Sequence, residues 1–302
     1  MEIFRALGAL AEPPSEATQR LTTLLGLGQA PTAAEYTSLF LRNLYPYASV
    51  YLGPEGMLGG EGRDRISGFW RALGMTPPSE PDHLALMLAQ YANLAELALA
   101  ETTGARRVAR ERSREAFLWE HLLSWLPPYL DKLAELAPPA YAAWGRVLEA
   151  ALAEEARRLD VQKLEAPLAL RPATRATDDA ALGTDAGVDE ILAVLLAPMR
   201  SGMILVHADL ARAARALGLG LRIGERRFVL RALLSQSPES VVEWLRVEAQ
   251  AWAERHAERT ESLGAIAAAW DARARETVQL AGMLLATLRR EPSTAGAGEA
   301  HD

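Results

Sequence analysis

The 302-residue chain contains no cysteine. This absence excludes thiol nucleophiles, disulfide bonds, thiolate zinc sites and iron–sulfur ligation. No uninterrupted apolar run approaches the about 18 residues that suggest a transmembrane helix. The N-terminal segment MEIFRALGALAEPPSE lacks the basic start and the long apolar core of a secretory signal. We therefore expect a cytoplasmic protein.

Residues that favour strands are also scarce. Phenylalanine occurs only 5 times, and valine and isoleucine are sparse, whereas alanine, leucine, glutamate and arginine dominate. These four residue types are good helix formers, so the composition predicts an all-α protein. The net charge of −7 argues against a broad affinity for nucleic acid and is compatible with a cationic partner.

Signatures of enzymes are missing as well. The histidines never occur at HExxH spacing, and there is no G-x-S-x-G sequence. The glycine-rich stretch 53–62 lacks the G-K-[ST] of a P-loop. GLGLRIG (218–224) follows a predicted helix rather than a strand, so it is not a dinucleotide fingerprint. We predict no catalytic residue and no metal site, and we expect a protein that is not an enzyme.

Helical spacing of apolar residues covers 4–11 and 15–26. A third helix is predicted to open at Thr32 as its N-cap, which places Tyr36, Leu39 and Phe40 on one face. Residues 45–62 are rich in Gly, Pro and Tyr and predict a long ordered loop without a helix. Further helices are predicted at about 63–74, 80–101, 106–126 and 138–160.

The distribution of helical periodicity also divides the chain into domains and a linker. Residues 163–187 combine Pro, Ala, Thr and Asp without periodicity, which predicts a flexible linker. The linker separates a helical domain at 1–162 from a smaller helical domain at 188–290, and residues 291–302 are expected to form a disordered tail.

The stretch SEPDHLALML (79–88) places acidic residues and a histidine directly before an apolar run. One interpretation is a helix start with Ser79 as N-cap, Asp82 at N3 and His83 at N4, in which Pro81 is tolerated in the first turn. The other is a binding site. A catalytic dyad is disfavoured, because adjacent residues on a helix point about 100° apart.

Four motifs occur along the first half of the chain. They are YTSLF (36–40), PYASVYL (46–52) with a glycine-bearing loop that ends near Gly59-Gly60, EPDHL (80–84) and HLLSW (121–125). In this order they resemble the TorD/DmsD/NarJ-like chaperones, which help molybdopterin oxidoreductases to mature. The chain departs from the Glu-Pro-x-Asp-His signature of that family, because no residue separates Pro81 from Asp82. The resemblance covers about residues 1–160 and transfers no function to 188–290.

The resemblance implies a TorD-like helical bundle domain and a cytoplasmic chaperone specific for one enzyme. Such a chaperone binds the twin-arginine leader or the immature catalytic subunit of a molybdopterin oxidoreductase, assists cofactor insertion and delays export. No cofactor is expected to bind stably, and the molybdopterin cofactor would be contacted only transiently through the client. Neither a nucleic-acid partner nor membrane insertion is expected.

The same resemblance implies a groove for the client near the Asp-His pair. Asp82 would supply charge near the arginines of the leader, and a neutral His83 would bridge the helix start to the loop 45–62 or to the peptide. Core packing remains an alternative for these side chains. The expected client-binding residues are Tyr36, Leu39, Phe40, Pro46, Tyr47, Gly60, Glu80, Pro81, Asp82, His83, His121 and Trp125.

A different function remains open for the C-terminal part. Residues 208–234 fit a helix–turn–helix in which Arg222, Arg226 and Arg227 face DNA phosphates. An ordinary helical hairpin with solvated arginines fits the same pattern.

Overall fold

The structure is a computed structural model that describes residues 2–171 and 187–290. Within these ranges every regular element is a helix, and the only extended contact is an isolated antiparallel bridge between Tyr47 and His83. The prediction of an all-α protein is confirmed. Among the same helices, none combines the length and the apolar character that crossing a bilayer requires.

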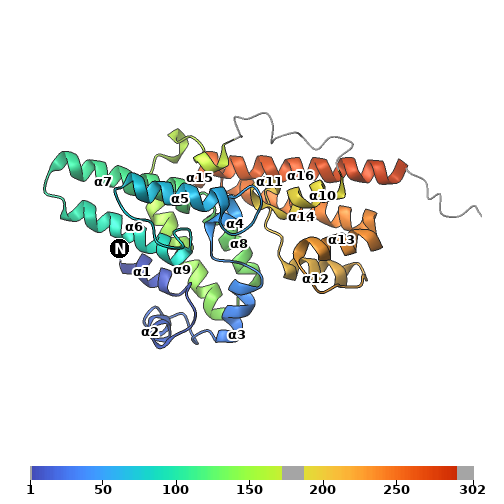
Figure 1. Ribbon diagram of the computed structural model, residues 1–302, viewed down its shortest axis with the longest axis horizontal. Helices are drawn as coiled ribbons and strands as arrows, with labels where there is room; N and C mark the ends of the chain where they lie inside the picture. The colour runs from blue at the N-terminus through green and yellow to red at the C-terminus, as the bar shows by residue number, and fades with distance from the viewer. Residues whose placement is uncertain (1, 172–186, 291–302) are drawn as a thin grey trace, which may run out of the picture.

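The N-terminal part consists of short and medium helices around an aromatic core (Figure 1). Its elements are α1 (Glu2–Ala9), α2 (Glu16–Leu24), α3 (Ala33–Tyr36), the π-helical turn η1 (Thr37–Leu41), α4 (Ala48–Leu52), α5 (Gly60–Ala72), α6 (Leu84–Ala100), α7 (Gly104–Phe117), the π-helical turn η2 (Leu118–Leu122), α8 (Leu126–Leu136) and α9 (Pro139–Ala156).

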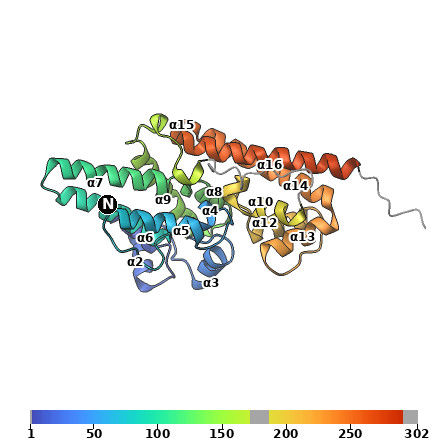
Figure 2. The same ribbon diagram turned by 45° about the horizontal axis from the view of Figure 1, so that its top comes forward.

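The C-terminal part is organised on two long helices, α14 and α16, which lie side by side (Figure 1, Figure 2). The other helices of this part pack on the same pair or on one another. The elements are α10 (Val188–Leu196), α11 (Pro198–Ser201), α12 (His207–Ala216), α13 (Arg226–Gln236), α14 (Pro238–Glu258), α15 (Thr260–Leu263) and α16 (Ala265–Arg290).

Local sequence signals locate some helix starts correctly and miss others. The Thr32 side chain accepts a hydrogen bond from the Glu35 N–H, and the Glu35 carboxylate accepts one from the Thr32 N–H, so the predicted cap of α3 is confirmed. The prediction of a loop throughout 45–62 is wrong, because α4 and the start of α5 lie within it. A Cβ atom on Gly62 would lie 2.9 Å from the Cα of Ser49, so glycine lets α5 pack directly on α4.

The predicted helix at 106–126 continues as a π-helical turn to Leu122 and is wrong beyond that residue. After Phe117 α7 gives way to η2, and a new helix, α8, starts at Leu126 with two prolines in its first turn. Proline is tolerated at this position because an N–H in the first turn has no partner within the helix. The pair Pro127-Pro128 therefore marks a helix start that sequence reasoning did not identify.

Part of the predicted linker is packed against the fold. Leu170 is buried, the N–H of Leu168 donates to the Glu120 carboxylate at 2.7 Å, and the Trp119 indole donates to the Glu165 carbonyl at 2.9 Å. Residues 172–186 of that linker and the predicted tail 291–302 lie outside the described residues. The domain boundaries at 162 and 188 stay a prediction.

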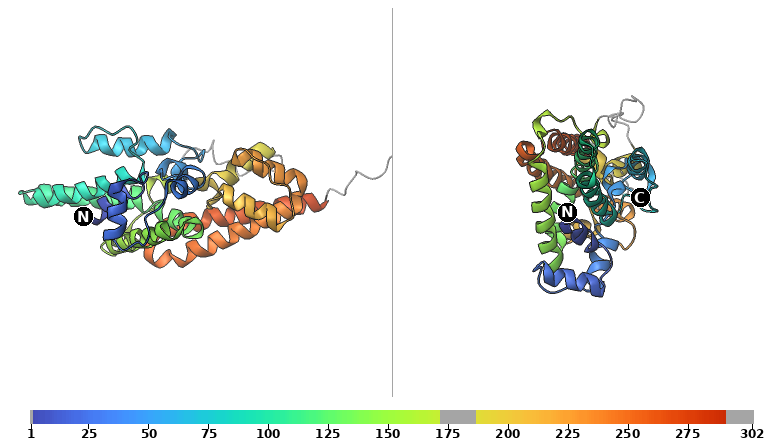
Figure 3. Two further views of the ribbon diagram at one scale, coloured as in Figure 1. Left: turned by 90° about the horizontal axis from the view of Figure 1, so that it is seen from below. Right: turned by 90° about the vertical axis from the view of Figure 1, so that its left-hand side faces the viewer.

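One hydrophobic cluster includes residues of both parts, among them Phe4 of α1, Trp144 of α9, Trp252 of α14 and Ala274 of α16. The long C-terminal helices reach the middle of the molecule, next to α8 and α9 (Figure 1, Figure 3).

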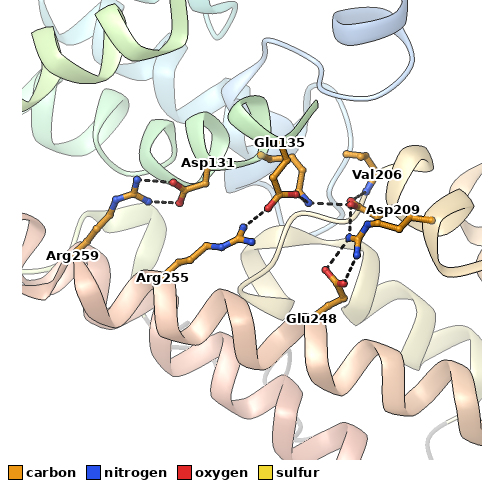
Figure 4. A network of polar contacts seen from close by, with 9 residues as sticks. Asp131, Glu135, Val206, Asp209, Glu248, Arg255 and Arg259 are labelled. Carbon is orange, nitrogen blue, oxygen red and sulfur yellow. Dashed lines mark hydrogen bonds and ion pairs between the residues drawn. The ribbon is translucent and has the colours of Figure 1, made fainter. Parts of the chain in front are cut away.

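A charged network fills the contact between α8 and the C-terminal helices (Figure 4). The amine of Lys132 is fully buried and lies 2.6 Å from Glu135 Oε2 and 3.1 Å from Asp209 Oδ1. The other carboxylate oxygen of Asp209 accepts a hydrogen bond from the Val206 N–H at 2.9 Å, at the start of α12. Asp209 therefore compensates the buried charge and caps a helix at the same time.

Two arginines at the C-terminal end of α14, Arg255 and the C-cap residue Arg259, extend this network along α8. Arg255 pairs with Glu135, and Arg259 pairs with both Asp131 and Glu149 of α9. A buried ammonium ion is costly when its partner is removed. Within this contact, we therefore expect the free energy of unfolding to fall most when the Lys132–Asp209 pair is broken.

We predict that Asp209→Asn lowers the free energy of unfolding by about 3 kcal/mol. The asparagine oxygen can still cap α12, so the loss reports the carboxylate charge that Asp209 presents to Lys132 and Arg212, while Glu135 still pairs with Lys132. Urea unfolding followed by circular dichroism measures this change. The control is Glu243→Gln, which breaks an exposed pair with Arg246 and should have a far smaller effect. Equal effects of the two substitutions would contradict the prediction.

Candidate functional site

Two backbone hydrogen bonds join the segment before α4 to the start of α6. The Ala48 N–H donates to the Asp82 carbonyl at 3.0 Å, and the Leu84 N–H donates to the Pro46 carbonyl at 2.8 Å. Between them Tyr47 lies opposite His83, and the two rings make an edge contact with centroids 4.7 Å apart. The second and third motifs of the sequence thus form one structural unit.

The predicted cap at Ser79 is wrong. α6 begins at Leu84, and its N-cap is His83, whose Nδ1 accepts a hydrogen bond from the Ala85 N–H at 3.3 Å. The bridge to Tyr47 holds His83 in an extended conformation, with φ −69° and ψ 133°. Residues 79–82 cannot enter the helix while this bridge exists, and local sequence rules do not detect it.

Asp82 faces the interior of the protein. Its side chain is buried, and Oδ2 accepts a hydrogen bond from the Ser49 N–H at 3.4 Å in the first turn of α4. Ser49 in turn accepts a hydrogen bond from the Gly59 N–H at 3.0 Å through its hydroxyl. The Asp82 carboxylate therefore orders the loop between α4 and α5.

Two exposed carboxylates lie beside the Tyr47–His83 pair. Glu12 Oε1 is 3.4 Å from His83 Nδ1, and its side chain is 49% exposed. Glu80 is exposed as well and lies close to Tyr47. Burial raises the pKa of Tyr47 to about 12, and the charge and hydrogen bond of Glu80 add to this shift. The phenol therefore stays protonated at neutral pH and can donate a hydrogen bond.

Sequence reasoning did not identify Glu12. It follows α1, and only the packing of α1 on α6 brings it to His83. This packing is close at Gly8, where a Cβ atom would lie 3.0 Å from the Ala85 carbonyl oxygen. No motif around residue 12 marks this long-range contact.

His83 is a neutral imidazole in this environment. Burial lowers its pKa, and the nearby carboxylates of Glu12, Glu80 and Asp82 oppose the shift without cancelling it. Because Nδ1 accepts the hydrogen bond from Ala85, the proton of the neutral ring belongs on Nε2. The ring can thus offer a donor at Nε2 while its other nitrogen caps α6.

The remaining predicted residues of the first two motifs lie mostly in the core. Tyr36 is 7% exposed, Leu39 3% and Phe40 0%, and the Phe40 ring makes edge contacts with Tyr141 and Trp144. Pro46 and Pro81 are buried as well. Tyr47 is half-buried, and Gly60 is exposed at the start of α5.

His121 and Trp125 have a different set of partners. Trp125 stacks on Tyr51, with centroids 5.3 Å apart and planes 10° apart, and its indole donates to the His121 carbonyl at 2.9 Å. The His121 ring contacts Phe69 and Phe117, and burial, with the charge of Arg65 adding, lowers its pKa to about 4. The fourth motif is thus part of an aromatic cluster around η2.

Two of the three arginines of the helix–turn–helix alternative donate hydrogen bonds to carbonyl groups of the same chain. Arg226 donates to the Leu205 carbonyl at 2.6 Å and Arg227 to the Asp189 carbonyl at 2.7 Å, whereas Arg222 is exposed. This geometry does not support DNA binding by α12 and α13. Across residues 2–171 and 187–290, no group of three histidine or carboxylate side chains is placed to hold a metal ion.

Comparisons with known proteins concern the N-terminal part. Residues 8–131 match the family model described as nitrate reductase delta subunit. The chain is 33% identical to the chaperone protein TorD of Vibrio vulnificus strain YJ016, over 35% of this chain and 54% of that protein. It is 30% identical to the chaperone protein TorD of Vibrio cholerae serotype O1 strain M66-2, over 44% of this chain and 64% of that protein.

The protein of the same name in Shewanella amazonensis is 32% identical over 37% of this chain and 56% of its own length. The chain thus spans between about half and two thirds of these relatives. No solved structure gives a significant match. The match over residues 8–131, together with these relatives, shows that the N-terminal part of the chain is similar to the TorD-like chaperones.

Proposed function

We propose that this protein is a chaperone for the catalytic subunit of a molybdopterin oxidoreductase. It binds the immature subunit, through a twin-arginine leader where the client has one, and keeps it from export until the cofactor has been inserted. It acts by binding alone. The names of the relatives support the chaperone class.

The observation that carries the proposal is the acidic rim around the Tyr47–His83 pair. A leader of this kind offers two adjacent guanidinium groups followed by an apolar stretch. Guanidinium groups bind carboxylates through paired hydrogen bonds and pack on aromatic rings. Glu12 is an exposed carboxylate beside the His83 ring, and Glu80 is an exposed carboxylate close to the half-buried Tyr47 ring.

The buried residues of the motifs have a supporting role in this proposal. Asp82 holds the start of α4, and Tyr36 and Phe40 pack against each other in the core. The charge that the client meets then comes from Glu12 and Glu80 rather than from Asp82. A cation at this rim remains in contact with solvent, so we expect moderate affinity that falls with salt.

We predict that the double substitution Glu12→Gln and Glu80→Gln weakens binding of a synthetic twin-arginine leader peptide about tenfold, because two carboxylates that face its arginines are lost. Isothermal titration calorimetry measures the change. The matched control is Glu258→Gln with Glu276→Gln, which removes the same charge from exposed positions on α14 and α16. A peptide with both arginines replaced by glutamine should bind wild type and double variant alike. Unchanged binding of the arginine peptide to the double variant would remove the rim from the site.

The histidine is tested by two substitutions that separate capping from binding. Asparagine at residue 83 preserves an N-cap acceptor, so His83→Asn should change the free energy of unfolding by less than about 0.5 kcal/mol. His83→Leu removes the cap and should lower it by about 1 kcal/mol. Both variants lose the ring contact with Tyr47 and the donor at Nε2, and both should bind the peptide more weakly. Wild-type affinity of a folded His83→Asn variant would confine His83 to helix capping.

A further inference from the structure

The helical hairpin of α6 and α7 projects from the body of the protein (Figure 1, Figure 2 and the left view of Figure 3). We call its outer end, residues 99–112, the arm. Every residue from 102 to 109 is exposed, and so are residues 111 and 112. Two apolar side chains belong to this surface, since Leu99 is 79% exposed and Val108 is 47% exposed.

The arm is basic in an acidic protein. It contains four arginines and two glutamates, a formal charge of +2, whereas the whole chain carries −7 and the rest of it therefore −9. Arg107 donates to the Glu101 carbonyl rather than to a carboxylate, and Arg110 lies 3.7 Å from Glu101. Arg106 and Arg112 make no hydrogen bond or ion pair with any described residue.

We propose that the arm binds the surface of an anionic lipid bilayer. Guanidinium groups bind phosphate well, and each arginine near such a surface strengthens attachment about fivefold. The arm projects from the body and is exposed over almost its whole length, so it suits a broad surface better than a small ligand. Leu99 adds an apolar side chain that the interfacial layer of a bilayer accepts.

The projection of the arm removes an electrostatic conflict. An acidic body is repelled by an anionic surface, but this repulsion is screened beyond a Debye length of about 8 Å at physiological salt. The 14 residues of α7 span about 21 Å. When only the end of the hairpin touches the bilayer, most of the negative charge of the protein body therefore lies farther from the lipid surface than the Debye length. Such attachment is reversible, stays at the surface and needs no helix that crosses the membrane.

Vesicle flotation with the full chain tests the proposal. Wild type should bind phosphatidylcholine vesicles that contain about 30% phosphatidylglycerol, should not bind pure phosphatidylcholine, and should be released at about 0.5 M salt. The variant Arg106→Glu with Arg112→Glu should lower the partition coefficient by roughly twentyfold or more. The control variant Arg215→Glu with Arg222→Glu changes the same charge at exposed positions outside the arm and should stay within about twofold of wild type.

Three results would overturn the proposal. The first is that wild type does not bind the anionic vesicles at low salt. The second is that the arm variant and the control variant lose vesicle binding equally. The third is that a polyglutamate peptide or duplex RNA captures wild type although the vesicles do not. The last result would assign the arm to a different polyanion. If the glutamate variant fails to fold by circular dichroism, Arg106→Gln with Arg112→Gln provides the decisive comparison.

Discussion

The candidate site depends on the short backbone bridge between residues 46–48 and 82–84. Its two hydrogen bonds fix where α4 and α6 begin, because the extended backbone that forms them cannot be helical. They also place the Tyr47 ring against the His83 ring and turn the Asp82 carboxylate toward the first turn of α4. Without the bridge, Glu12 and Glu80 would be two unrelated surface carboxylates.

A second constraint acts far from this bridge. The fully buried Lys132 is held between two carboxylates, Glu135 of its own helix and Asp209 of α12. Lys132 also lies over the ring of Trp252 in α14, 5.4 Å from its centroid. The part of the chain that resembles the TorD-like chaperones is thus completed by a charge from outside that part.

The comparison of sequence and structure separates local from long-range information. Helical periodicity predicts the all-α class, and the Thr32 cap is found because both of its hydrogen bonds lie within three residues. The start of α6 is missed because His83 is held by a strand-like contact with Tyr47, 36 positions earlier in the chain. Glu12 is missed for the same kind of reason. Motif resemblance singles out residues 46–52 and 80–84, which the structure joins, but it does not show which carboxylates face outward.

The most direct test of the proposed site is hydrogen–deuterium exchange of the full chain with and without a twin-arginine leader peptide. A peptide held at the acidic rim should slow exchange of the amides in residues 45–49 and 80–85, and at the end of α1 next to Glu12. Exchange across α14 and α16 should not change. Slower exchange confined to residues 118–126, with the bridge segments unaffected, would place the client on the aromatic cluster of His121 and Trp125 and would contradict the account.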